Sequence, residues 1–281
     1  MGLNIGKTII SGLALTLALA GCDHMTEEEK AADLGAINAI DAVGLSDVML
    51  NLADPAEAVK FFRRSLAEDP ENIGHKRNLA LALVRAHEYA EATLVFEQLI
   101  ATGEATDDDR VAYAESLVRN GVWDEARVQL DAVPPTVETF DRYFLEALIA
   151  DHFKEWEKAD RFYDVARGLT TRPAQVLNNW GISKSNRGQT SKAEDLFKRA
   201  VTADPRLFAA KNNWVISRAK RKIYDLPVMP TTDTERAILF FNIAREALNN
   251  GDRDIGLGLL DNAIDTHPQY FEPAVALRNS L

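Results

Sequence analysis

Alanine recurs at an almost constant interval through the middle of this chain. The alanines in this register are Ala58, Ala92, Ala126, Ala159 and Ala193, with spacings of 34, 34, 33 and 34 residues. A large side chain follows each alanine four residues later, namely Phe62, Phe96, Leu130, Tyr163 and Phe197. Four residues are about one helical turn, so the alanine and the large side chain share one face of a helix. Helix pairs repeated in this way bury their apolar faces against one another and predict an α-solenoid.

Other residues keep the same phase as the alanines. Pro70, Pro205 and Pro268 stand at one offset, where proline ends the second helix of a pair because it has no N–H. The pattern resembles the tetratricopeptide repeat (TPR), a helix-turn-helix unit, and the resemblance implies an all-α, right-handed α-solenoid of about six to seven helix pairs with a C-terminal capping helix. The repeat region is expected at 39–224, with complete repeats at 39–72, 73–106, 107–139, 140–173 and 174–207.

The repeat pattern breaks at residues 225–234. Two prolines in the stretch DLPVMPTT preclude a continuous helix there. Thr232 followed by Glu235 makes a capping box that opens a new helix. We expect residues 235–281 to form a final helix pair and a capping helix, which covers the apolar end of the solenoid.

Cys22 is the only cysteine of the chain, and it closely follows an apolar run, residues 8–20. This run is shorter than the ~20 residues that a membrane-spanning helix needs, and it is typical of a cleaved secretory signal. The LAGC sequence that ends at Cys22 resembles the lipobox of bacterial lipoproteins. The resemblance implies that residues 1–21 are removed, that Cys22 is the site of lipid attachment, and that residues 22–38 form a tether and a first helix. An ordinary signal peptide with a chance cysteine is the alternative.

The lipobox resemblance also implies a location. A lipid on Cys22 would anchor the protein in a membrane, with the chain facing the periplasm. Asp23 directly follows the cysteine, and in enteric bacteria an aspartate at this position keeps lipoproteins at the inner membrane. This rule varies between bacterial groups, so attachment to the outer membrane stays open.

Charge and residue pattern argue against several classes of function. The net charge is −11, whereas nucleic-acid binding needs a basic surface. The five histidines are scattered without metal-ligand spacing, and neither a phosphate-binding glycine loop nor a nucleophile motif occurs in the sequence. Acidic runs such as 107–109 stand at expected helix starts, where they complement the helix dipole. We therefore predict no catalytic residue, no metal site, no cofactor, no nucleic-acid partner and no small-molecule substrate.

Partner binding is the remaining class of function. In TPR families, asparagines and lysines near the fifth and sixth positions of the first helix hold a partner segment on the concave face. The resemblance places Asn178, Asn179, Lys211, Asn212 and Asn213 at or beside these positions. Asparagine both donates and accepts hydrogen bonds, which suits an extended peptide backbone. The alternative for Asn179 and Asn213 is that they satisfy the turn of the neighbouring repeat.

A basic run follows these asparagines. It consists of Arg218, Lys220, Arg221 and Lys222 and lies in the one section of the chain, residues 141–224, that is basic overall. Such a run could bind an acidic partner segment or anionic lipid head groups. The plainer reading is a solvated helix end, because cations are favoured near a helix C-terminus.

The C-terminal half narrows the resemblance. The stretches LNNWGISKSNRG, AEDLFKRAVTADPRLFAAKNNW and KIYDLPVMPTTDTERA, together with the lipobox, resemble the TadD-type lipoproteins of tight adherence (Flp) pilus assembly systems. This resemblance implies a non-enzymatic periplasmic scaffold whose partners are the pilus secretin or other assembly components. The alternative is a TPR adaptor lipoprotein that recruits peptidoglycan hydrolases or synthases.

Overall fold

The computed structural model describes residues 44–281, and every regular element within this range is a helix. A helical stretch at residues 44–51 is followed by α2 (Pro55–Glu68), α3 (Ile73–Arg85), α4 (Tyr89–Ala101), α5 (Asp107–Arg119), α6 (Trp123–Asp131), α7 (Phe140–His152), α8 (Trp156–Gly168), α9 (Ala174–Asn186), α10 (Thr190–Ala203), α11 (Phe208–Ala219), α12 (Asp233–Asn249), α13 (Arg253–Thr266) and α14 (Glu272–Asn279). The predictions for the signal at 1–21, the tether at 22–38, Cys22 and Asp23 lie outside the described residues.

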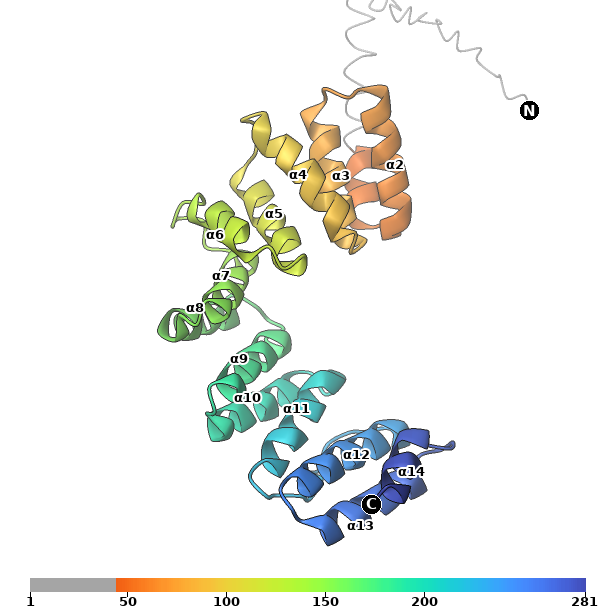
Figure 1. Ribbon diagram of the computed structural model, residues 1–281. Coiled ribbons are helices and arrows are strands. Elements are labelled where there is room, and N and C mark those ends of the chain that lie inside the picture. Colours follow the sequence, from red (N-terminus) through yellow and green to blue (C-terminus); the bar gives the residue numbers. More distant parts are fainter. Residues whose placement is uncertain (1–43) are drawn as a thin grey trace, which may run out of the picture.

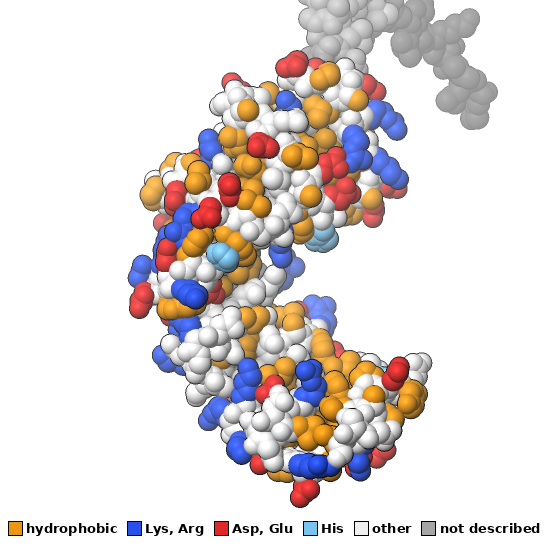
Figure 2. Space-filling view, viewed as in Figure 1, with side chains coloured by type: hydrophobic (Ala, Val, Ile, Leu, Met, Phe, Trp, Pro, Cys, Tyr) orange, Lys and Arg blue, Asp and Glu red, His pale blue; other side chains and the backbone are white. Residues whose placement is uncertain are grey.

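The helices stack in chain order into a curved solenoid. Figure 1 shows the curve, with α6 and α8 on its outer side and α5, α7, α9 and α11 nearer its inner side. Each helix packs against its neighbours in the sequence, as expected for a repeat protein. The two ends of the solenoid face each other across a hollow in the space-filling view (Figure 2).

The repeated small and large residues form the core as the sequence predicts. The five alanines of the register are completely buried, and the large residue four positions later is at most 3% exposed in every repeat. The core runs through the stack as consecutive clusters, from Ala58 near one end to Ala274 near the other. Each repeat therefore depends on its neighbours for burial of its apolar face.

One turn geometry follows α3, α5, α7, α9, α11 and α12, the first helices of six consecutive repeats. A residue two or three positions past the helix end has a positive φ, and it is Gly121, Gly188 or Gly251 in three of these turns and His87, Lys154 or Lys222 in the other three. The next N–H donates to the carbonyl five residues back, as from Glu88 to Leu83 at 2.9 Å and from Ile223 to Arg218 at 3.1 Å. This is the Schellman ending of a helix. Its presence after α11 shows that the sixth repeat makes its turn like the others.

The sixth repeat nevertheless lacks its second helix. The chain from Lys220 to Thr232 contains no helix, because prolines stand where that helix would form. Leu226 and Met229 pack into the adjoining core clusters, whereas Val228 between them is fully exposed. Thr232 and Glu235 then make the expected capping box at the start of α12, and α13 and α14 complete the stack.

Two helical glycines give opposite predictions for the same substitution. A Cβ on Gly181 in α9 would lie 2.5 Å from Cε1 of the buried Phe197 ring, whereas a Cβ on Gly258 in α13 would meet nothing within 4 Å. Gly181→Ala is therefore expected to lower the free energy of unfolding by ~1–3 kcal/mol through overpacking. Gly258→Ala is expected to raise it by ~0.5–1 kcal/mol, because alanine favours the helix. Urea unfolding followed by circular dichroism measures both, and shifts of the same sign would contradict this reading.

Candidate functional site

The predicted asparagines lie on the first helices α9 and α11, and their side chains form hydrogen bonds within the fold. The side chain of Asn178 is buried, and its Oδ1 accepts from Nδ2 of Asn213 at 2.9 Å. Oδ1 of Asn212 accepts from Nδ2 of Asn242 at 2.7 Å, and Nδ2 of Asn179 donates to the carbonyl of Gln175 at 3.1 Å. These contacts join α9, α11 and α12. They also occupy polar atoms that a partner backbone would need, and a binding role for these residues stays a prediction.

The predicted lysine and the basic run are mostly paired within the fold. Lys211 is 3% exposed, and its Nζ lies 2.9 Å from Oε2 of Glu235. The other pairs are Arg218 with Glu194 and Asp225, Arg221 with Glu194, and Lys222 with Asp252. Lys220 is exposed and has no ion pair with any residue in the range 44–281. The run therefore offers little uncompensated positive charge, and its binding role also stays a prediction.

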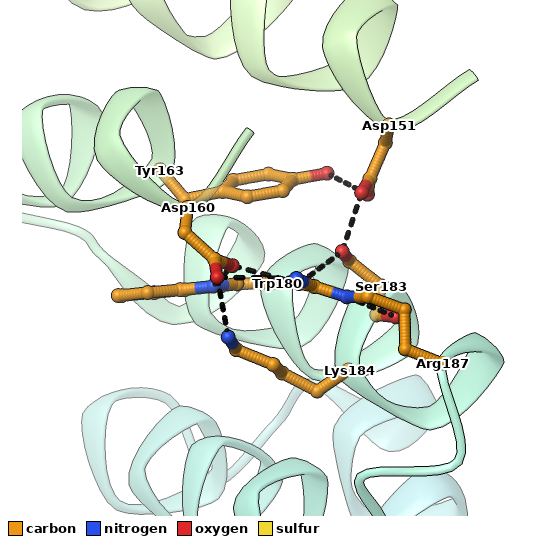
Figure 3. Close-up of polar contacts among 7 residues, drawn as sticks. All are labelled: Asp151, Asp160, Tyr163, Trp180, Ser183, Lys184 and Arg187. Atoms are coloured by element: carbon orange, nitrogen blue, oxygen red, sulfur yellow. Dashed lines mark hydrogen bonds and ion pairs between the residues drawn. The ribbon is translucent and has the colours of Figure 1, made fainter. Parts of the chain in front are cut away.

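A polar cluster that the sequence analysis did not anticipate joins the fourth repeat to the fifth (Figure 3). Asp160 of α8 accepts from Nζ of Lys184 at 2.6 Å, from Nη2 of Arg187 at 2.7 Å and from Nε1 of Trp180 at 2.7 Å. Lys184 and Arg187 expose only 10% and 7% of their side chains. The carboxylate of Asp160 thus neutralises two buried cations at the junction between repeats.

A second carboxylate extends this cluster towards α7. Asp151 accepts from the Tyr163 hydroxyl at 2.9 Å and from the Ser183 hydroxyl at 2.5 Å. Burial raises the pKa of Asp151, and these two hydrogen bonds oppose the rise. Burial acts in the same direction on Asp160, but the hydrogen bonds from Arg187, Lys184 and Trp180 outweigh it and lower its pKa to about 2. With every polar group partnered, this cluster stabilises the junction and has no open position for a ligand.

An open groove lies between α5, α7 and α9. Two adjoining hollows, of about 160 and 810 Å³, share the residues Phe140, Asp141 and Gln175. The smaller hollow is walled by α5 and α7, and the larger extends over the loops that precede α9 and α11. We call the two hollows together the central groove. It adjoins the first helices of three consecutive repeats. Its volume is large enough to hold an extended segment of a partner chain.

The central groove has an apolar floor and one isolated carboxylate. Phe140 and Phe144 stack one turn apart on α7 with ring centroids 5.6 Å apart, and Phe144 also belongs to the core cluster around Tyr163. Asp141 stands between them in the sequence. Its side chain is exposed at the mouth of the groove, and the desolvation that remains there raises the pKa of its carboxyl. A carboxylate with this desolvation gains by meeting a cation.

Sequence reasoning missed the central groove. Asp141 and Gln175 occupy the second position of two successive first helices and line the groove, whereas Asp108 holds the same position in α5 and lines neither hollow, so the register alone does not mark the site. The prediction placed the site at the fifth and sixth positions instead, where Asn178, Asn212 and Asn213 bond to side chains of neighbouring repeats.

Residues 44–281 contain neither a metal-binding cluster nor a membrane-spanning helix. The range holds no cluster of three or more histidine, cysteine, aspartate or glutamate side chains arranged to hold a metal ion. None of its helices combines the length and the apolar character required to cross a bilayer.

Neither the protein families nor the curated proteins include a match to this sequence. Solved structures match its shape. A TPR protein from Parabacteroides merdae is 13% identical, with a TM-score of 0.53 over 85% of this chain and 96% of that one. The C-terminal part of a TPR repeat-containing protein from Cytophaga hutchinsonii is 16% identical, with a TM-score of 0.54 over 83% and 97% of the two chains.

A third match is longer than this protein. It is the APC/C hetero-tetramer Cut9–Hcn1, 15% identical with a TM-score of 0.57, in which the match covers 81% of this chain but only 46% of the other. Identities this low show the fold alone. They confirm the prediction of a TPR α-solenoid.

Proposed function

We propose that this protein is a non-enzymatic, lipid-anchored scaffold that holds a segment of a partner protein in its central groove. The observation that carries the proposal is the groove itself, which lies across first helices of consecutive repeats and presents apolar and polar side chains together. A rigid solenoid presents such a surface without large rearrangement, which limits the entropy lost on binding.

We further propose that the partner belongs to tight adherence (Flp) pilus assembly, with the pilus secretin as the first candidate. The support is the resemblance of the C-terminal half to TadD-type lipoproteins, together with the interruption at 225–234. Capture of the tagged protein from cross-linked cells, followed by mass spectrometry, tests this directly. Enrichment of a secretin or other pilus components supports the assignment, and a deletion strain should then lose its pili. Enrichment of peptidoglycan hydrolases or synthases would overturn it in favour of the adaptor function.

Cys22→Ala tests the proposed anchor. Without the thiol no lipid can be attached, so the protein is expected to move from the membrane fraction to the soluble periplasmic fraction. Immunoblots of fractionated cells and metabolic labelling with a palmitate analogue measure the change. Cys22→Ser also removes the thiol but changes the size of the side chain very little. It is the matched control and should behave like Cys22→Ala. Persistent lipid labelling of either variant would contradict the anchor.

The same fractions also assign the membrane. Separation of inner and outer membranes on a sucrose gradient, carried out with the unaltered protein and with Asp23→Ser, compares the two proposed locations. If the enteric rule applies, the unaltered protein collects with the inner membrane and the variant shifts to the outer membrane. If the two proteins distribute identically between the membranes, Asp23 does not determine the location.

A further inference from the structure

The charge of the smaller hollow is unbalanced. Its charged lining residues are Glu115, Arg119 and Asp141. Arg119 lies 3.5 Å from Glu115 and partly neutralises it, whereas none of the residues in the range 44–281 makes an ion pair or a side-chain hydrogen bond with Asp141. Among the charged residues of this hollow, Asp141 is therefore the one without an ion pair to any residue in the range 44–281.

The larger hollow is balanced by comparison. Beside Asp141 it is lined by Asp204, Arg172 and Arg206. Arg206 lies 3.2 Å from Asp204, so these two charges compensate each other. Arg172 forms no ion pair with Asp141, but its positive charge makes the net charge of this hollow zero. Asp141 lines both hollows, so the central groove as a whole is neutral, and its carboxylate without an ion pair lies where the two hollows meet.

Aromatic rings flank the carboxylate of Asp141. Phe140 and Phe144 stack nearly parallel, with an interplanar angle of 12°, and both line the smaller hollow with Asp141. A guanidinium or ammonium group interacts favourably with aromatic faces, and the aliphatic part of an arginine or lysine packs on apolar surface while its charged end meets a carboxylate. The volume of about 160 Å³ corresponds to one large side chain.

We propose that the central groove selects a partner segment by a single basic side chain, which packs against Phe140 and pairs with Asp141. The inference rests on the proposed function, in which the groove holds a protein segment, and adds the chemistry that the segment must carry. The rest of the segment lies along the larger hollow, where the side-chain amide of Gln175 can bond an extended backbone. The groove would thus select a basic residue of the partner, whereas the basic run at 218–222 would select an acidic one.

The test is selection of peptides by the full-length lipidated protein in detergent micelles. A phage library of random dodecapeptides is panned on the unaltered protein, on Asp141→Asn and on Asp108→Asn. Asp108 is the matched control because it is exposed, stands at the same second position of α5, and lines neither hollow. Both substitutions remove a similar interaction with a helix N-terminus, worth ~0.3–1 kcal/mol, so their effects on folding should match.

The unaltered protein and Asp108→Asn are expected to enrich peptides with arginine or lysine beside an apolar residue, and Asp141→Asn should lose this preference. The best peptide and its arginine-to-citrulline analogue are then compared by fluorescence anisotropy. Citrulline keeps the shape and removes the charge, so Kd should rise about tenfold to a hundredfold for the unaltered protein. For Asp141→Asn the two peptides should bind almost equally.

Each other outcome overturns the inference. One such outcome is that the enriched peptides lack a basic residue but lose binding to Phe140→Ala, which shows that they bind in the groove. This outcome would leave the proposed function intact and remove the role of Asp141. Peptides insensitive to both Phe140→Ala and Asp141→Asn would place selection elsewhere on the molecule. Failure to enrich any peptide would show that the groove does not select a linear segment, whereas the proposed function is judged separately by capture from cells.

Discussion

Asp160→Asn is expected to lower the free energy of unfolding by ~3 kcal/mol, as measured by guanidinium unfolding followed by circular dichroism. The change leaves Lys184 and Arg187 as buried cations without a counter-charge, and breaking a buried ion pair typically costs ~3–5 kcal/mol. We expect the lower end of this range because 29% of the Asp160 side chain is exposed. Asp195→Asn is the control, since its pair with Arg199 is 3.7 Å long and largely exposed, and it should change stability by less than ~1 kcal/mol.

The pH dependence separates the ion pair from other effects of this substitution. The pKa of Asp160 is lowered to about 2 from its ordinary value of 3.8. The carboxylate therefore adds stability that is fully present above pH 3.8 and is lost as the pH falls through about 2. The difference between the unaltered protein and Asp160→Asn should shrink over this interval. A difference that is constant from pH 6 to pH 2 would contradict an ionic origin.

Tyr163→Ala is expected to have the largest effect on stability, a loss of ~3–5 kcal/mol. Tyr163 is 1% exposed and lies in the core cluster with Phe144 and Trp180, and its hydroxyl donates to Asp151. Tyr163→Phe keeps the packing and removes only the hydrogen bond, so it should cost ~1–3 kcal/mol. Chemical unfolding of both variants measures the two contributions. Equal losses would show that the hydrogen bond, and not the packing, dominates.

The sequence predicts the stack of helices because the information is local. The alanine and the large residue that follows it both belong to one helix, and the small side chain alone decides how closely the second helix approaches. The buried positions of Ala193 and Phe197 therefore follow from the register. The capping box at Thr232 and Glu235 was also predictable, since both of its partners lie within one turn.

The candidate site was less predictable because its contacts cross from one repeat to another. The register places Asn178 and Asn213 on first helices, but it does not show that their side chains bond to each other across 35 residues. Likewise, Lys184 and Asp160 are 24 residues apart. The central groove depends on the relative tilt of α5, α7 and α9, which arises from the packing of whole helices.

The basic run illustrates the same limit. Its sequence suggested an anion-binding surface. In the structure three of its residues pair with carboxylates: one on α10, one at the N-terminus of α13 and one in the segment 225–234. Lys222 has an additional constraint, because it holds the left-handed position of the turn after α11. A conformational requirement of this kind is visible only when the turn is compared with the glycines at the same place in other repeats.

The missing second helix of the sixth repeat has a consequence for how the chain can be cut or extended. Between Lys220 and Thr232 the backbone follows no helix, and Val228 projects fully into solvent. Yet Val215 and Ala219 of α11 share one core cluster with residues of α12 and α13. The two sides of the gap are therefore held together by side-chain packing, independently of the peptide bonds that join them. Exposed, non-helical segments of this kind are the natural places for proteolytic nicking and for insertion of new sequence. The segment between Lys220 and Thr232 can therefore accept an inserted loop or a proteolytic cut while the superhelix persists.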